Sequence, residues 1–220
     1  MRISRDFLKG DGFNVPCAMI TPAKSAGAVV IVHGYGGNKE EQLGLAWRVA
    51  EMGFVACTID LRGHGENALE FGDDALKDVE AAIGYCRRYG KVIVIGHSLG
   101  GRLALLSSAD AVIALSPALC KTYSTPIHEG ITSLRTYRVQ EREVASVFGM
   151  LERLPVWQPA NGRRVLIIYG SRDMQDIAAA CRELKARGVP AIEVPGGLHN
   201  DIFLLEATVA AIKDELAPSG

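Results

Sequence analysis

The stretch from Lys91 to Gly101, KVIVIGHSLGG, joins an apolar run to the start of a helical pattern. Residues 91–96 form a short apolar run, as in a buried strand, and the pattern of residues 99–108 is typical of a helix. Between them lies the pattern G-x-S-x-G, centred on Ser98. Such a turn is very tight and needs small residues beside the serine, which Gly96 and Gly100 supply. The stretch therefore predicts a strand, a sharp turn that exposes Ser98, and a helix.

Strands and helices alternate on both sides of this unit. Residues 7–20 predict a β-hairpin with its turn at 9–12. Apolar runs predict further strands at 28–33, 54–59, 111–115, 165–169 and 191–194. Helices are expected at 38–52, 74–89, 174–187 and about 202–216, the first with Leu43, Ala46, Trp47 and Ala50 on one face. This alternation predicts an α/β fold, a mostly parallel twisted sheet with helices on both faces.

The alternation breaks between about residues 120 and 162. This insertion contains Pro126, Pro155 and Pro159, and we expect one helix in it, around 140–151. It is too short for a domain with its own core. We therefore predict one domain over 1–220 with a short cap over one end of the sheet.

Composition narrows the class of protein. The chain has 220 residues, 48% apolar and 22% charged, with a formal net charge of −1. Nothing in this balance favours nucleic acid or anionic lipid as a partner. No apolar run reaches the roughly 18 residues of a membrane span, and the N-terminus has no signal-peptide pattern, so the cytoplasm is the simplest location. The five cysteines are scattered, which favours buried reduced thiols over a metal site.

A second glycine-rich turn, His33-Gly34-Tyr35-Gly36-Gly37, follows the strand at 28–33. If Ser98 attacks an acyl group, the oxyanion that forms needs two fixed donors. The backbone amide of Leu99 is one candidate, and that of Tyr35 is the other, with Gly36 as the alternative. A plain turn is the competing interpretation, and the sequence lacks the GxxxxGK[ST] and GxGxxG patterns of phosphate-binding loops.

Together with Asp60-Leu61-Arg62-Gly63-His64-Gly65, these motifs resemble the α/β-hydrolase fold family, and most of all its esterase, lipase and serine-peptidase-like members. The resemblance covers nearly the whole chain apart from 120–162. It implies the chain order serine, acid, histidine, which assigns the acid to Asp173 and the base to His199.

The chemistry of a serine nucleophile agrees with these assignments. A hydroxyl becomes reactive when a base accepts its proton, which His199 can do near neutral pH. Asp173 would hold the imidazole in the correct tautomer. Three other carboxylates are weaker candidates for the acid. Asp176 is expected inside a helix, Glu193 is expected within a strand, and Asp201 is too close to His199 in the sequence. We interpret His33, His64 and His97 as structural, and place His128 in solvent.

These inferences predict a carboxylesterase-like serine hydrolase that cleaves a small or medium carboxylic ester through an acyl-enzyme on Ser98, without metal or organic cofactor. Thioesters and amides or short peptides share the same machinery, and a catalytically silent binding protein of this fold is an alternative of another class. The natural substrate and the oligomeric state stay open. Nine apolar or aromatic residues of the insertion could line an acyl pocket, namely Tyr123, Ile127, Ile131, Leu134, Val147, Phe148, Met150, Leu151 and Trp157. The alternative, preferred for most of them, is that they only pack the insertion onto the sheet.

Overall fold

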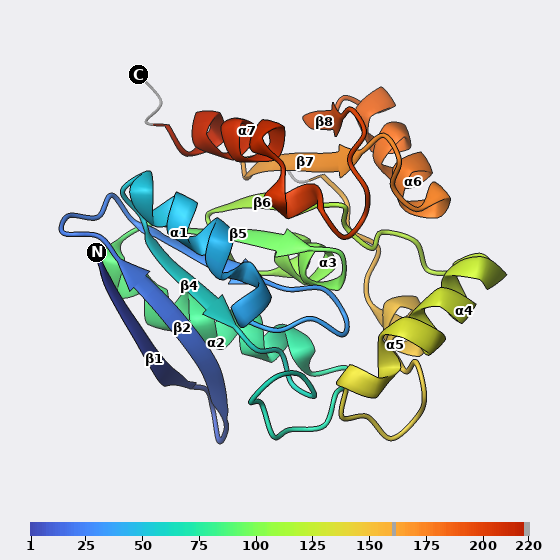
Figure 1. Ribbon diagram of the computed structural model, residues 1–220, viewed down its shortest axis with the longest axis horizontal. Coiled ribbons are helices and arrows are strands. Elements are labelled where there is room, and N and C mark those ends of the chain that lie inside the picture. Colours follow the sequence, from blue (N-terminus) through green and yellow to red (C-terminus); the bar gives the residue numbers. More distant parts are fainter. Residues whose placement is uncertain (160–161, 218–220) are drawn as a thin grey trace.

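A computed structural model describes residues 1–159 and 162–217 of the chain. Its eight strands form one sheet in the order β1-β2-β4-β3-β5-β6-β7-β8 (Figure 1). β1 (Arg2–Lys9) and β2 (Asn14–Thr21) form the expected hairpin, and β2 also runs antiparallel to β4. The remaining pairs are parallel and join β3 (Ala28–Val32), β4 (Val55–Ile59), β5 (Val92–His97), β6 (Ala111–Leu115), β7 (Arg164–Gly170) and β8 (Ala191–Val194). The predicted α/β class is confirmed.

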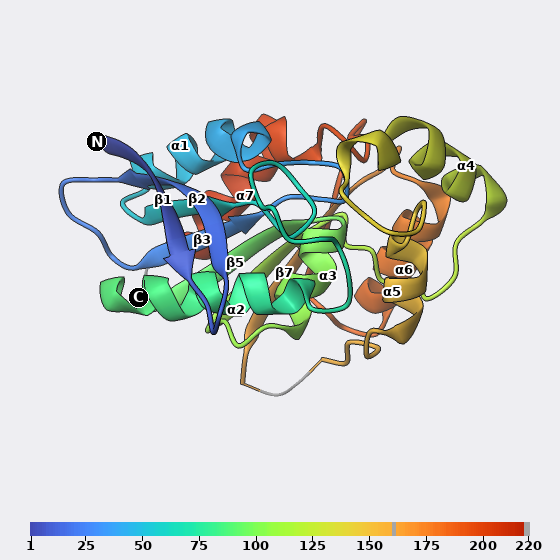
Figure 2. The same ribbon diagram turned by 90° about the horizontal axis from the view of Figure 1, so that it is seen from below.

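Helices cover both faces of this sheet (Figure 2). α1 (Leu43–Glu51) and α7 (Glu206–Leu216) pack on one face. α2 (Ala75–Cys86), α3 (Leu99–Leu106) and α6 (Gln175–Ala186) pack on the other. Short 3₁₀ turns precede α1 and α7, at η1 (Glu40–Gln42) and η4 (Ile202–Leu204), and follow α2, at η2 (Arg87–Tyr89). A fourth, η3 (Thr136–Arg138), lies between β6 and β7.

The strands β3 and β6 are apolar at every position, and β4 is apolar except at Thr58, because both faces of the sheet are covered. Val30 of β3 packs with the core under α2 and α3, whereas its neighbour Ile31 packs with the core under α1 and α7. A parallel strand buried on both sides needs no alternation of apolar and polar residues. The uninterrupted runs of the sequence therefore identified these strands correctly.

The expected buried face of α1 is correct at Ala46 and Ala50 and wrong at Trp47. Trp47 is 41% exposed, and its indole N–H donates to Glu51 on the surface of α1. The buried stripe is formed by Leu45, Ala46, Val49 and Ala50. The error arose because Trp47 was grouped by its apolar character, whereas Leu45 and Val49, four residues apart, set the face that meets the sheet.

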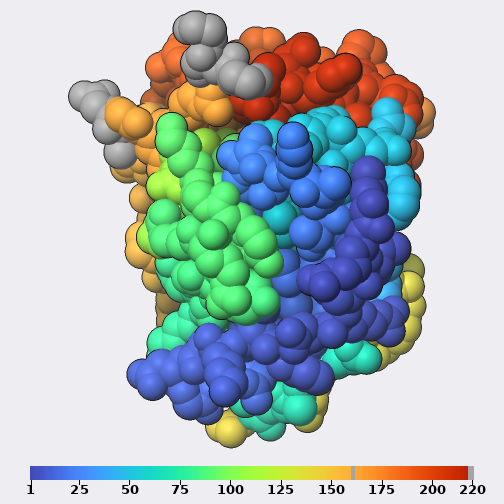
Figure 3. Space-filling view, turned by 90° about the vertical axis from the view of Figure 1, so that its left-hand side faces the viewer, coloured from blue at the N-terminus to red at the C-terminus, as the bar shows by residue number. Residues whose placement is uncertain are grey.

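The insertion lies between β6 and β7, at the carboxyl ends of the parallel strands (Figure 1). It contains two α-helices in its described part, α4 (Thr125–Leu134) and α5 (Val147–Arg153), rather than one helix at 140–151. Pro126 stands in the first turn of α4, where proline is tolerated because the amide it lacks would be unpaired there. Residues 160–161 of the expected insertion lie outside the described residues. The opposite end of the molecule shows N-terminal residues in blue, part of the C-terminal region in red and, between them, green residues from the region of α2 (Figure 3).

All five cysteines are free thiols, four of them buried and Cys120 partly exposed, which agrees with the expected reduced state. Within residues 1–159 and 162–217, no helix combines the length and apolar character needed to cross a bilayer.

Arg102 of α3 ties the insertion to the sheet. Its side chain is buried, and its guanidinium donates to the carbonyl oxygens of Leu119, at 3.2 Å, and Pro155, at 2.5 Å. These two carbonyls stand near the beginning and the end of the insertion. A single buried cation therefore holds both stems against the helix that follows Ser98.

We expect Arg102→Met to lower the free energy of unfolding by about 2–3 kcal/mol, because two carbonyl groups lose a charged donor. Protease cleavage within the insertion should also become faster. Urea unfolding and limited proteolysis measure the two effects. The matched control is Arg142→Met, whose exposed guanidinium pairs only with Glu70; equal stability of the two variants would contradict this role of Arg102.

Candidate active site

Ser98 stands at a strained turn between β5 and α3. Its backbone has φ 53° and ψ −113°, a conformation that side chains other than glycine rarely adopt. A Cβ atom at Gly96 would collide with the carbonyl oxygen of Gly100, and one at Gly100 with those of Val32 and His33. Both glycines are therefore required for the close approach of strand, turn and helix. The turn leaves the Ser98 side chain partly exposed.

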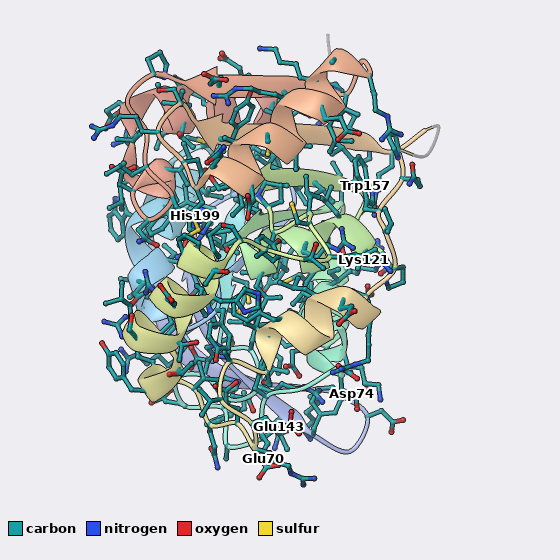
Figure 4. The ribbon with its side chains drawn as sticks, turned by 90° about the vertical axis from the view of Figure 1, so that its right-hand side faces the viewer. Glu70, Asp74, Lys121, Glu143, Trp157 and His199 are labelled. Carbon is teal, nitrogen blue, oxygen red and sulfur yellow. The ribbon has the colours of Figure 1, made fainter. Side chains whose placement is uncertain are left out.

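A chain of hydrogen bonds connects Ser98, His199 and Asp173. The Ser98 hydroxyl lies 3.0 Å from Nε2 of His199 and donates to it. Nδ1 of the same ring donates to Oδ1 of Asp173 at 2.8 Å. Figure 4 looks onto the end of the molecule that carries the insertion, where His199 lies between the C-terminal segment and the insertion. The structure thus brings together three residues that are far apart in the sequence.

Asp173 is kept ionised by several donors. Burial by itself raises the pKa of its carboxyl, but hydrogen bonds from His199, from the Ser116 hydroxyl and from the Met174 amide lower it below its usual value. Ser116 follows β6 directly and was not singled out from the sequence. The signal available was its place after a buried strand, at the same edge of the sheet as Ser98.

The other acidic candidates have different partners. Asp176 accepts the Ser124 amide at the start of the insertion. Asp201 accepts the Leu198 amide, within its own loop. Glu193 pairs with Arg182 at the surface. None of these contacts reaches the His199 ring, which agrees with Asp173 as its partner.

Hydrogen bonds in the glycine-rich turn after β3 distinguish between the amides of Tyr35 and Gly36 as oxyanion donors. The Gly36 amide donates to Nε2 of His64 at 3.0 Å, so it is not free to donate to an oxyanion. The amides of Tyr35 and Leu99 have no acceptor among the residues that the structure describes. Both residues border the same cavity as Ser98. The geometry therefore favours Tyr35 over Gly36 as the partner of Leu99 in binding an oxyanion.

Neutral histidines fix this turn. Nδ1 of His33 donates to the Gly34 carbonyl while its Nε2 accepts the Leu61 amide. His64 likewise donates from Nδ1 to the Arg62 carbonyl while it accepts from Gly36. A ring can donate at one nitrogen and accept at the other only when it is neutral. Burial is the main cause that lowers the pKa of His33 to about 4 and that of His64 to about 3.

The segment after β4 holds buried charges that support the same region. Asp60 accepts Nζ of Lys39 at 2.7 Å, and both side chains are buried. Asp78 accepts both the backbone amide and the guanidinium of Arg62. These contacts hold the loop after β4 in place.

Two cavities meet at Ser98. The larger, of about 340 Å³, lies under the insertion and is bordered by Glu41, Arg135, Gln175, His199 and Asn200 together with apolar side chains. The smaller has about 30 Å³ open to water-sized groups. Seven of the nine apolar insertion residues line one or both cavities, namely Tyr123, Ile127, Ile131, Leu134, Val147, Phe148 and Leu151.

Packing alone is the preferred interpretation for most of the nine, whereas these seven also border the cavities at Ser98. Met150 and Trp157 do pack into the core, and Trp157 lies well away from His199 (Figure 4). His128 is exposed as expected, and its ring stacks on Phe148. Among residues 1–159 and 162–217, no three His, Cys, Asp or Glu side chains form a group that could hold a metal ion.

Comparisons with known proteins extend these findings. The model of the family described as "Alpha/beta hydrolase family" matches residues 29–192. A search of curated proteins found no match. Est1E from Butyrivibrio proteoclasticus aligns with a TM-score of 0.71 at 18% identity, over 96% of this chain and 97% of its own.

Two further solved structures share the fold. An esterase from Pyrobaculum calidifontis has a TM-score of 0.67 at 22% identity, over 99% of this chain and 86% of its own. EstE1, a thermostable carboxylesterase from a metagenomic library, has a TM-score of 0.71 at 19% identity, over 99% of this chain and 90% of its own.

The contacts of Asp173 generate a pH prediction. Ser116→Ala removes one donor to the carboxylate, so the pKa of Asp173 should move upward, toward its usual value. The stability that ionised Asp173 contributes is present at neutral pH and is lost as the pH falls through this pKa, so the acid-side loss should begin at higher pH. A ¹³C titration of the Asp173 carboxyl measures the shift. Ser171→Ala is the control, since its hydroxyl contacts Gly196 instead; identical titrations would rule out the effect.

Proposed function

This chain belongs to the alpha/beta hydrolase family, and we propose that it is a carboxylesterase-like serine hydrolase that cleaves a small or medium carboxylic ester. The observation that carries this proposal is the 3.0 Å contact between the Ser98 hydroxyl and Nε2 of His199. It is a nucleophile–base contact of the length that acyl transfer requires. The 2.8 Å contact of the same ring with Asp173 supports it.

In the proposed reaction, Ser98 Oγ attacks the ester carbonyl carbon while Nε2 of His199 takes the hydroxyl proton. The Tyr35 and Leu99 amides hold the oxyanion of the tetrahedral intermediate. The imidazolium, stabilised by Asp173, then gives its proton to the departing alcohol, which leaves an acyl group on Ser98. Water attacks this acyl-enzyme, with His199 taking one proton and returning it to Ser98 as the carboxylic acid departs.

The size of the cavities supports a short acyl group. A site needs about 10–15 Å³, measured for water-sized groups, to hold one water molecule. The smaller cavity, at about 30 Å³, therefore suits an acetyl or propionyl tail. Its walls are mainly apolar and come from the insertion, α3 and α6. We propose that residues 1–220 act as one domain in which the insertion is the cap over this site.

Two structural neighbours, the Pyrobaculum calidifontis esterase and the carboxylesterase EstE1, also favour an ester as the substrate. Their identity to this chain is low, so they add weight to the choice of ester without identifying one. The choice between ester, thioester and amide depends on the leaving group, which faces the larger cavity.

Covalent labelling tests the nucleophile. A fluorophosphonate probe should add its mass to the folded wild-type protein at Ser98 and should not label Ser98→Ala. The same variant should lose hydrolysis of p-nitrophenyl acetate by a factor on the order of 10⁶ in kcat, as is typical when the nucleophile of such a unit is removed. Mass spectrometry and a spectrophotometric assay measure these outcomes.

The control for this experiment is Ser133→Ala, on the exposed side of α4, which should label and turn over like the wild type. Circular dichroism should show that Ser98→Ala is folded. Labelling at another residue, or activity retained by folded Ser98→Ala, would remove Ser98 from the mechanism.

The apolar cavity predicts a preference in acyl length. The wild-type protein should hydrolyse p-nitrophenyl acetate and propionate with higher kcat/KM than the octanoate. Phe148→Ala opens the cavity, so the preferred acyl chain should lengthen by roughly two carbons. Phe7→Ala, at an exposed position of β1 far from the site, is the control. An unchanged chain-length profile in Phe148→Ala would show that the acyl group binds elsewhere.

A further inference from the structure

Arg135 brings a cation to the wall of the larger cavity. It is the residue that follows α4, and its guanidinium donates to Oδ1 of Asn200 at 2.8 Å. Asn200 is the neighbour of His199 in the chain. The Arg135 side chain lies against Gly36, where an added Cβ would come within 3.0 Å of its Cβ and Cδ atoms. Arg135 is thus held between the loop of His199 and the turn that carries the Tyr35 amide.

The charge of Arg135 is not balanced within the protein. No carboxylate forms an ion pair with it among residues 1–159 and 162–217. Glu41 borders the same cavity, but it is paired with Arg138 at 3.0 Å. The hydrogen-bond acceptor that Arg135 does contact, the Asn200 side chain, is neutral. Arg135 therefore brings to this cavity, beside the reacting groups, a cation that has no ion-pair partner among the described residues.

We propose that Arg135 binds a carboxylate on the alcohol portion of the substrate. The substrate class is then an ester of a short acyl group with an alcohol or phenol that bears a carboxylate. This inference rests on the proposed function of Ser98. A guanidinium presents parallel N–H donors that match a carboxylate, and one unpaired cation balances the single charge of that group better than it balances a phosphate dianion.

The arrangement of the cavities assigns the carboxylate to the alcohol side. The smaller cavity borders Leu99 and is mainly apolar, so it suits the acyl tail. His199, which gives its proton to the departing alcohol, borders both cavities, and the larger of the two is the one that Arg135 also borders. With about 340 Å³ available there, an aromatic alcohol with a carboxylate fits between the two residues.

A matched pair of esters tests this inference. 4-Acetoxybenzoate and 4-acetoxybenzamide differ in one group, a carboxylate against a neutral amide of similar shape. The wild-type protein should hydrolyse the benzoate with the higher kcat/KM, each value being normalised to the rate in alkali. Arg135→Gln, which keeps an amide donor for Asn200, should reduce this preference by roughly tenfold, mainly through KM. Higher salt should reduce it in the wild type as well.

Arg142→Gln is the control, because Arg142 belongs to the same insertion but pairs with Glu70 outside the cavity. It should keep the wild-type preference. The inference is overturned if the wild type shows no preference, or if Arg135→Gln slows both esters equally, which would indicate a merely positional role. Absence of both hydrolysis and fluorophosphonate labelling at Ser98 would instead overturn the proposed function, and this inference with it.

Discussion

The backbone of Ser98 is the constraint on which the rest of the structure depends. A residue other than glycine in such a conformation costs on the order of 1–3 kcal/mol, which its surroundings must offset. The Ser98 amide donates to the Leu115 carbonyl at 2.9 Å, and the Ser98 carbonyl accepts the amides of Ala118 and Arg102 at 3.0 and 3.1 Å. Because two of these partners belong to β6 and the turn after it, the pairing of β5 with β6 also fixes the position of the hydroxyl.

The parallel sheet extends this local constraint to the whole site. Carboxyl ends of parallel strands meet at one edge, so residues distant in sequence become neighbours there. Ser116 illustrates the effect, because it follows β6, the neighbour of β7, and so its hydroxyl reaches the carboxylate of Asp173. The residues that the sheet gathers at this edge, each just after a strand, are Tyr35, Ser98, Ser116, Asp173 and His199.

Much of the fold follows from the sequence, because the central strands are buried on both faces and appear as apolar runs. The helix α4 of the insertion was not expected, although Ile127, Ile131 and Leu134 repeat with helical spacing, because it contains Pro126 and Gly130, which both disfavour helices. The motif around Ser98 predicted the nucleophile, the family resemblance assigned Asp173 and His199, and the structure brings the three within hydrogen-bond distance. Contacts across the sequence were not predictable, for example that between Gly36 and His64, which decides which amide is free.

The buried histidines link this geometry to protonation. The pKa of His97 is lowered to about 3, mainly by burial, and its Nε2 lies 2.7 Å from the His199 carbonyl. His33 and His64 support the loops around Ser98 only in the neutral form, because each accepts an amide hydrogen at Nε2. An unfolded histidine takes up a proton near pH 6.5, so each of these rings costs stability as the pH falls below that value. Acid therefore lowers the stability of the fold through these buried rings.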